Sequence, residues 1–424
     1  MPYATLSPVH QLLITLCRRD AETCVTDSEL GLLSDHAHWN ALTFAAHSHR
    51  VDGVVLTTLE RIVRKSPGTC GRLPGDWAEP LKLLRRQGLG WDLEQRRVLA
   101  WLAKHGSSPV VLKGSALRHS VYRESAERPV SDLDLLFPAD GIPAARRILE
   151  ELGYRDPNSA EANALYAEHH FHTQMEHLGG FKLELHWALT LPGPHSQIDA
   201  AAVLREARPV PQPGGSFLAP RPEHMVLHLA SQSTEDSVSR LGRIVDADRV
   251  IACAAGSFDW DLLQREATEG HLQNVLGVTL RLAEQLFGTP VPARFTDRLH
   301  VSPIARANLA ALRPVVWIME QRALRFGAVR TLMKAWLETA PGARLDITLK
   351  VLRLRRDPLK LLHDAVVWDY DAPRSQPWNW IPAWIKLVAY QVVVWGRVLA
   401  NVARASRAEE MDFWTARGAS HERR

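Results

Sequence analysis

The segment Ser131-Asp-Leu-Asp-Leu-Leu136 constrains the fold more than any other, because two carboxylates alternate in it with leucines. A period of two is typical of a β-strand, in which successive side chains point to opposite faces. Asp132 and Asp134 would then share one face, while Leu133 and Leu135 point into the core. Two like charges held together on a buried strand are costly unless a cation joins them. The sequence therefore predicts a strand with a cation-binding face.

The residues around this strand predict a compact α/β unit of about 80 residues, built from short elements. Glycine ends the first apolar run at Gly114, and Gly179-Gly180 separates two later runs as in a hairpin. Strands are expected over residues 109–114, 130–137, 169–177 and 181–189, and helices over 115–124 and 143–152.

Helical periodicity dominates on both sides of this unit, over residues 8–105 and from Glu223 to about Ala405. Between the unit and the second helical region, residues 209–222 contain five prolines and two adjacent glycines, which predicts a linker or an extended loop. The expected fold class is α+β and mostly helical. The expected domains are an N-terminal helical region (1–105), an α/β core (106–207), a helical domain (208–300) and a basic helical extension (301–424).

The net charge of +4 conceals an uneven distribution along the chain. Residues 301–424 carry 20 basic and 11 acidic side chains, against 31 and 36 in the first 300 residues, and they hold eight of the 14 tryptophans. With 46% hydrophobic and 23% charged residues, the composition excludes collagen-like and wholly disordered chains. Four scattered cysteines and the lack of a signal-peptide pattern predict a reducing, cytoplasmic location.

Lys113-Gly114-Ser115 lies at the expected junction between the first strand and its helix. Glycine allows a tight turn and a close backbone approach, and the first amides of a helix form an anion site. A triphosphate could bind there, with the Ser115 hydroxyl as a further donor. Lys113 and Arg128 flank the junction and are candidates for phosphate contacts, or for ion pairs within the fold.

A third acid, Glu184, lies in Phe181-Lys-Leu-Glu-Leu-His-Trp187 on the same strand face as Lys182 and His186. Together with Asp132 and Asp134 it would form a set of hard oxygen ligands, which suits two Mg²⁺ or Mn²⁺ ions. A glycine-serine turn, then two acids on one strand, then an acid on a later strand is the order expected of two-metal nucleotidyl transfer. In such a site the ions stabilise the leaving pyrophosphate and activate the attacking hydroxyl.

These motifs resemble those of the bacterial uncharacterised nucleotidyltransferase family, within the DNA polymerase beta-like nucleotidyltransferase superfamily. The likeness rests on Leu112–Ser115, Arg128–Leu136 and Leu183–Trp187, and it extends to Trp39–His47, Leu241–Asp246, Phe258–Leu263 and Phe287–Pro292, so it covers about residues 35–300. It implies a polymerase beta-like core that uses an NTP. By this resemblance, Gly114 and Ser115 hold the triphosphate, Asp132 and Asp134 hold the metals, and Glu184 completes the site.

The histidines leave several interpretations open. His170 and His172 share a face of the expected hairpin, and His186 lies beside Glu184, so the three could line a cleft, serve the fold, or bind zinc. The usual zinc spacing is absent and no cysteine is near. His224 and His228 are four residues apart on an expected helix, which favours packing against the α/β unit.

The acceptor and the partners also stay open. The acceptor could be a small molecule, a peptide or protein, or an RNA end. The alternative is a non-catalytic nucleotide-binding or scaffold protein of a biosynthetic complex. The basic patch at 350–356 leaves nucleic-acid contact possible. The Trp-rich segment at 378–405 is expected to be a core helix, a helix that binds a protein or peptide partner, or a peripheral membrane helix. Its uncharged stretch is too short to span a bilayer.

Overall fold

The computed structural model describes residues 6–157, 170–191, 196–235, 238–299, 301, 314–319, 337 and 339. The expectations for the basic patch at 350–356 and the Trp-rich segment at 378–405 lie outside these residues. Within the described part, none of the helices is long and apolar enough to cross a membrane.

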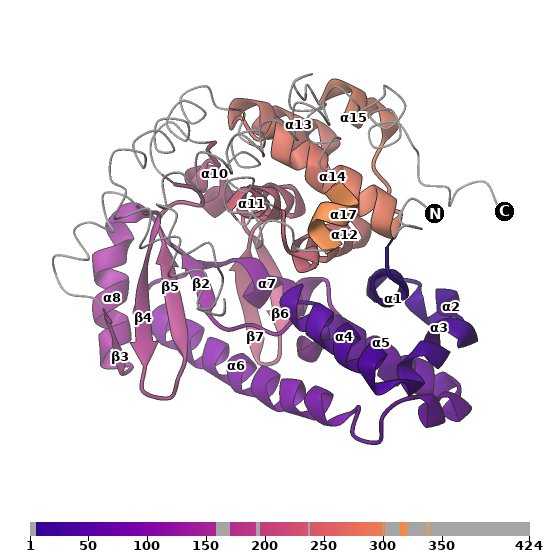
Figure 1. Cartoon of the computed structure of the whole chain (residues 1–424). Helices are drawn as coiled ribbons and strands as arrows, with labels where there is room; N and C mark the ends of the chain where they lie inside the picture. The colour runs from indigo at the N-terminus through magenta and orange to yellow at the C-terminus, as the bar shows by residue number, and fades with distance from the viewer. Residues whose placement is uncertain are drawn as a thin grey trace, which may run out of the picture.

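Within the described residues, seven strands form one mixed sheet in the order β3-β4-β5-β2-β1-β7-β6 (Figure 1). The central pairs β2/β5 and β1/β7 are parallel, and the other four pairs are antiparallel. The strands are β1 (Val110–Val111), β2 (Leu133–Leu136), β3 (Tyr154–Arg155), β4 (His172–His177), β5 (Lys182–His186), β6 (Arg208–Gln212) and β7 (Gly215–Ala219).

Helices surround the sheet, as the periodicity predicted, and the α+β, mostly helical fold class is confirmed. Those before the sheet are α1 (Pro8–Cys17), α2 (Ala21–Cys24), α3 (Asp27–Gly31), α4 (His36–Ser48), α5 (Asp52–Lys65) and α6 (Glu79–Lys104). Those within it are α7 (Lys113–Ser120), α8 (Ile142–Glu151) and α10 (Ala200–Arg205). Those after it are α11 (Pro222–Glu235), α12 (Leu241–Cys253), α13 (Trp260–Glu269), α14 (Gln273–Phe287), α15 (Ala293–Arg298) and α17 (Pro314–Met319).

One face of the sheet is apolar and packs against α6 and α8. Leu133 and Leu135 of β2 pair with Leu183 and Leu185 of β5, and all four are fully buried. On the same face, Trp91 of α6 packs edge-on against Phe181, with ring centroids 5.0 Å apart. The indole of Trp101 on α6 also donates to the Ile148 carbonyl of α8 (3.0 Å). Since strand side chains alternate, the acids of β2 and β5 must lie on the opposite face.

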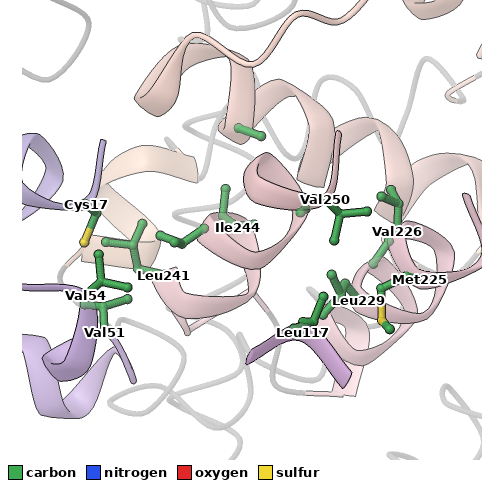
Figure 2. Packing of buried hydrophobic residues seen from close by; sticks show 14 of the residues in the cluster. Cys17, Val51, Val54, Leu117, Met225, Val226, Leu229, Leu241, Ile244 and Val250 are labelled. Atoms are coloured by element: carbon green, nitrogen blue, oxygen red, sulfur yellow. The ribbon is translucent and has the colours of Figure 1, made fainter. Parts of the chain in front are cut away.

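The helices after the sheet are held to the N-terminal helices by apolar packing. Figure 2 shows Leu241 of α12 beside Val51 and Val54 at the start of α5. The backbone follows the same contact, because the Gly242 amide donates to the His49 carbonyl at 2.9 Å. A Cβ at Gly242 would lie 2.9 Å from that oxygen, so only glycine fits this approach without a shift.

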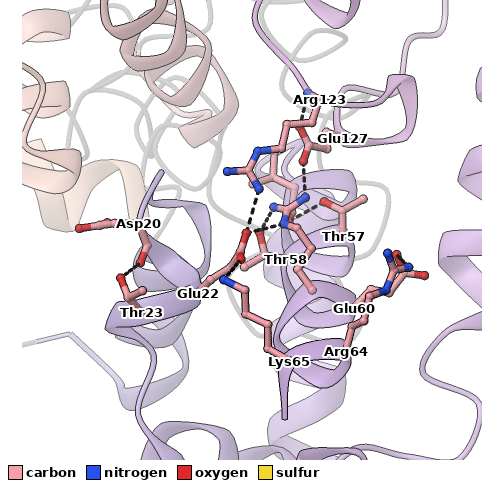
Figure 3. A network of polar contacts seen from close by, with 12 residues as sticks. Asp20, Glu22, Thr23, Thr57, Thr58, Glu60, Arg64, Lys65, Arg123 and Glu127 are labelled. Atoms are coloured by element: carbon pink, nitrogen blue, oxygen red, sulfur yellow. Dashed lines mark hydrogen bonds and ion pairs between the residues drawn. The ribbon is translucent and has the colours of Figure 1, made fainter. Parts of the chain in front are cut away.

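A charged network joins α2 and α5 to the loop before β2 (Figure 3). Glu22 pairs with Arg61 (2.9 Å), Lys65 (2.5 Å) and Arg123 (2.9 Å), and Arg61 also contacts Glu127. These contacts, the hydrogen bond from Lys65 above all, lower the pKa of the Glu22 carboxyl to about 2. The network thereby fixes the loop that leads into β2.

The linker prediction for residues 209–222 is wrong, because most of this segment is a hairpin of the sheet. β6 pairs with β7, and β7 pairs in parallel with β1. Phe217 and Ala219 of β7 alternate into the core, and the turn uses Gly214 with φ +86°. Pro209 and Pro211 are tolerated because β6 is an edge strand, where a missing amide breaks no central ladder.

His49 provides a test of the contact between the N-terminal and C-terminal helices. Its ring is buried, Nε2 lies 3.3 Å from the Met319 carbonyl, and Nδ1 accepts from the Leu241 amide at 3.4 Å. Burial lowers the pKa of His49 to about 4, against about 6.5 in an unfolded chain. The unfolded state therefore binds the proton more tightly. Stability should be intact above about pH 6.5 and fall toward pH 4, by up to about 3 kcal/mol.

Urea unfolding of the wild type and of His49→Asn between pH 4 and 7 measures this effect. The difference in unfolding free energy between the two proteins should shrink as the pH falls, because only the wild type must protonate a buried ring. A difference that is constant over this range would contradict the assignment.

Candidate active site

The parallel pairing of β2 with β5 brings the predicted acids together. In this register Asp134 lies opposite Glu184, and Leu136 lies opposite His186. Asp132 precedes β2 by one residue, and the charges of Asp134 and Glu184 act on its carboxyl to raise its pKa. β4 extends the polar face, with His172 opposite His186 and Gln174 opposite Glu184. The amide of Gln174 donates to Glu184 Oε1 at 3.4 Å.

Lys113 supplies a cation between Asp134 of β2 and Glu184 of β5. It is the first residue of α7 and has a left-handed backbone, with φ +49°. Its Nζ donates to Asp134 Oδ1 at 2.7 Å and lies 3.4 Å from Glu184 Oε2. Burial acts to lower the pKa of Lys113, but the charges of Asp134 and Glu184 outweigh it and raise this pKa above its ordinary value. The ammonium therefore stays charged between the two carboxylates.

His172 and His186 join the same cluster. His186 is fully buried, and its Nε2 lies 3.0 Å from Asp134 Oδ1 and 3.3 Å from Glu184 Oε2. His172 Nε2 lies 3.9 Å from Glu184 Oε1, and the two imidazole rings are 5.0 Å apart. Burial, followed by the charge of His186, lowers the pKa of His172 to about 4, so this ring is neutral at pH 7. His170 stands next to this pair, with its ring 6.0 Å from that of His172.

The three acids carry more negative charge than the described cations offset. Burial raises the pKa of Asp132 to about 6, and the neighbouring charges of Asp134 and Glu184 add to the effect. Burial acts in the same direction on Asp134, but Lys113 and His186 outweigh it and hold its pKa well below the usual range. The pKa of Glu184 is lowered too, because the hydrogen bond from His186 and the charge of Lys113 outweigh burial. Asp132 is therefore the carboxyl of the three whose ionised form is least stabilised, and a further cation would stabilise it.

Gly114 and Ser115 place α7 against the segment that enters β2. A Cβ at Gly114 would lie 2.9 Å from Val130 Cγ1 and 3.4 Å from the Arg128 guanidinium carbon, so glycine permits this close approach. The Ser115 hydroxyl is buried and donates to the Asp132 carbonyl at 3.1 Å. Gly114 and Ser115 are thus the second and third residues of α7, and the left-handed backbone at this junction belongs to Lys113, so the prediction of a turn at Gly114 is corrected by one residue. Ser115 anchors the backbone of Asp132.

Arg128 forms an ion pair with α12. The sequence had predicted either a phosphate contact or an ion pair within the fold for this residue. Its Nε donates to both oxygens of Asp246, at 2.9 and 3.0 Å, and its Nη1 donates to the Pro129 carbonyl. The Tyr122 hydroxyl donates to Asp246 at 2.6 Å. Asp246 is fully buried, so this link connects the entry to β2 with the helices after the sheet.

The chain matches the model of the uncharacterised nucleotidyltransferase family over residues 35–288, which include the whole acid cluster. It belongs to this family. The comparisons found no match among curated proteins or solved structures. Family membership makes the chain a nucleotidyltransferase, an enzyme that uses an NTP.

One residue of this nucleotidyltransferase near the site was not predicted from the pattern. His228 of α11 is buried, and neither ring nitrogen has a hydrogen-bond partner in the described part of the chain. Burial holds the pKa of His228 well below its usual range, and the charges of Lys113 and His186 lower it further. α11 packs against α7, the helix that begins at Lys113. Its neighbour at i−4, His224, contacts Glu266 at 3.0 Å. The spacing of the two histidines predicted a packing helix, and it held no signal that one of them faces the site.

The donor set of the nucleotidyltransferase fits divalent cations. Asp132, Asp134 and Glu184 provide hard carboxylate oxygens, which Mg²⁺ and Mn²⁺ prefer. The ammonium of Lys113 lies between the carboxylates of Asp134 and Glu184, so a positive charge is stable at this position. The surplus of negative charge described above would be offset by bound ions.

Replacing Lys113 tests whether its ammonium occupies the place of an ion. Lys113→Met should lower the unfolding free energy by about 3 kcal/mol in EDTA, because buried carboxylates lose their partner. Mg²⁺ or Mn²⁺ should then raise the melting temperature more in this variant than in the wild type, since no ammonium competes with the ion.

Lys182→Met is the matched control. Lys182 also lies on the polar side of β5, but it is exposed and pairs with the partly exposed Glu176 at 2.9 Å. Its loss should therefore change stability by less than about 1 kcal/mol. Equal stabilisation of all three proteins by the ion would contradict the prediction.

Proposed function

We propose that the enzyme transfers a nucleoside monophosphate from an NTP to a hydroxyl- or phosphate-bearing acceptor and releases pyrophosphate, with Mg²⁺ or Mn²⁺ bound by Asp132, Asp134 and Glu184. The observation that carries this proposal is the register of β2 and β5, which sets the acids of two strands on one face beside the start of α7. Family membership supports nucleotidyl transfer in general. The acid cluster supports its dependence on divalent ions.

Bound ions would neutralise the charge that develops on the transferred phosphoryl group and on the leaving pyrophosphate. The protein supplies the positions. The first amides of α7, at Gly114 and Ser115, form the anion site for the triphosphate. Lys113 can exchange its carboxylate partners for a phosphate. When an ion binds Asp134 and Glu184, the ammonium of Lys113 is released and can contact a phosphate oxygen.

Arg128 acts on this site through its contacts. Its pairing with Asp246 fixes the segment that enters β2, and its guanidinium packs beside Gly114. The phosphate role expected for Arg128 would be limited to nitrogens that Asp246 does not engage. His170, His172 and His186 extend the polar face along β4 and β5, where they would line the approach of the acceptor.

The proposal is tested with α-³²P-labelled NTPs. The protein is incubated with each of the four NTPs and Mg²⁺ or Mn²⁺, with and without cell extract, and pyrophosphate release and label transfer are measured. We expect Asp132→Asn, Asp134→Asn and Glu184→Gln each to reduce transfer by at least about 100-fold, because a metal-binding carboxylate is lost. Fractionation of the labelled extract identifies the acceptor as a small molecule, a protein or an RNA.

Glu176→Gln is the matched control, because Glu176 is a partly exposed acid on β4 that pairs with Lys182. Its activity should match the wild type. Transfer that survives in Asp132→Ala/Asp134→Ala would contradict the metal assignment. Binding of NTP without transfer to any fraction would favour the alternative of a nucleotide-binding or scaffold protein.

A further inference from the structure

His172, Glu184 and His186 form a compact group of mixed ligands beside the two acids of β2. One ligand atom from each of the three residues lies within 4.8 Å of the others. Ligands held by one ion at about 2.0–2.2 Å stand roughly 3–4 Å apart, so small side-chain movements would bring all three onto a single ion. The backbone already sets this geometry, because His172 and His186 are register partners on β4 and β5.

The ligand atoms of this group lie in buried surroundings that are rich in carboxylates. His186 is fully buried, and its Nε2 faces two carboxylates at 3.0 and 3.3 Å. The side chains of His172 and Glu184 are only 15% and 17% exposed. Burial of this many polar groups is costly unless each is satisfied.

His228 supplies an independent observation. Both of its ring nitrogens are buried without a hydrogen-bond partner in the described part of the chain, and an unsatisfied buried polar group is destabilising. His228 lies on α11, which packs against α7, and the charges of Lys113 and His186 lower its pKa. A hydrated ion held by the neighbouring cluster would bring water, which can satisfy a buried imidazole.

Nitrogen ligands change which ion this place prefers. Mg²⁺ is bound through oxygen and keeps several waters, whereas imidazole suits the ions of iron, nickel, copper and zinc. A set of two imidazoles and one carboxylate therefore discriminates against Mg²⁺, while the all-carboxylate pair Asp132 and Asp134 does not.

We propose that His172, Glu184 and His186 bind a transition-metal divalent cation in preference to Mg²⁺, and Mn²⁺ serves as the paramagnetic probe of this site. Glu184 is shared with the three acids, so one ion lies on the histidine side of the catalytic face and another can be held by Asp132 and Asp134. The proposal rests on the proposed function only in placing this ion within the catalytic site. Its test measures ligation and does not require turnover.

The test uses the full-length protein, with Mn²⁺ as the probe in the presence of a large excess of Mg²⁺. Electron paramagnetic resonance measures the bound Mn²⁺, and electron spin echo modulation detects the coupling of its unpaired electrons to histidine ¹⁴N. We expect bound Mn²⁺ with clear ¹⁴N modulation in the wild type. His172→Gln should weaken the modulation and lower the Mn²⁺ affinity at least about tenfold.

His186→Gln removes the second nitrogen ligand, but it alters a fully buried residue. His172→Gln, at a less buried ring, therefore carries the test if His186→Gln fails to fold by circular dichroism. His177→Gln is the matched control. His177 is on the same strand as His172 but on the opposite face, where its ring packs against Tyr154 and its Nδ1 accepts from the Gly179 amide, so this variant should keep both the modulation and the affinity.

Each outcome decides between the two proposals. Mn²⁺ that binds without ¹⁴N modulation, modulation unchanged by His172→Gln, or no Mn²⁺ binding under Mg²⁺ excess would overturn the mixed-ligand site. If NTP transfer persists in those cases, the proposed function stands without it. Modulation that depends on His172 in a protein that transfers no nucleotide would support the ion site and overturn the proposed function.

Discussion

The parallel pairing of β2 with β5 is the constraint on which the rest of the site depends. It places Asp134 opposite Glu184, and burial of these like charges is tolerated because Lys113 Nζ lies between them at 2.7 and 3.4 Å. His186 Nε2 stabilises the same two carboxylates from the other side. The polar face therefore concentrates negative charge, which a divalent ion can offset better than a single ammonium. The opposite face of the sheet is apolar, so the strands cannot slip by one residue without burying the acids against α6.

The helices on either side of the sheet hold this arrangement in place. Arg128 pairs with the fully buried Asp246 of α12, and Gly114 lets α7 pack against Arg128. Glu22 and its cationic partners tie the preceding loop to α5. The entry to β2 is thus fixed by helices that lie before and after the sheet in the chain. This gives a physical reason for a family match that extends from residue 35 to 288, well beyond the residues that carry the acids.

Local patterns predicted most of the sheet and the position of the acids on it. The alternation around Asp132, the glycine junction at Gly114 and the hairpin at Gly179-Gly180 depend on neighbours in the sequence, and the structure has a strand, a helix start and a turn at these places. The prediction was wrong for the hairpin of β6 and β7, because prolines are typical of loops and also tolerated on an edge strand. No local pattern distinguishes an edge strand from a linker, because the distinction between the two depends on whether β7 pairs with β1 in the folded sheet.

By itself, the sequence determined a strand that contains Asp134 and a strand-to-helix junction near Gly114 that precedes it, because side-chain alternation and backbone freedom are local properties. Only the tertiary structure decided the partners. Lys113 pairs with Asp134 and Glu184, and Arg128 pairs with Asp246, which lies 118 residues later in the chain. A charged or polar side chain has many possible partners along a chain. Packing selects one, because a buried charge needs the partner that the fold brings within a few ångströms.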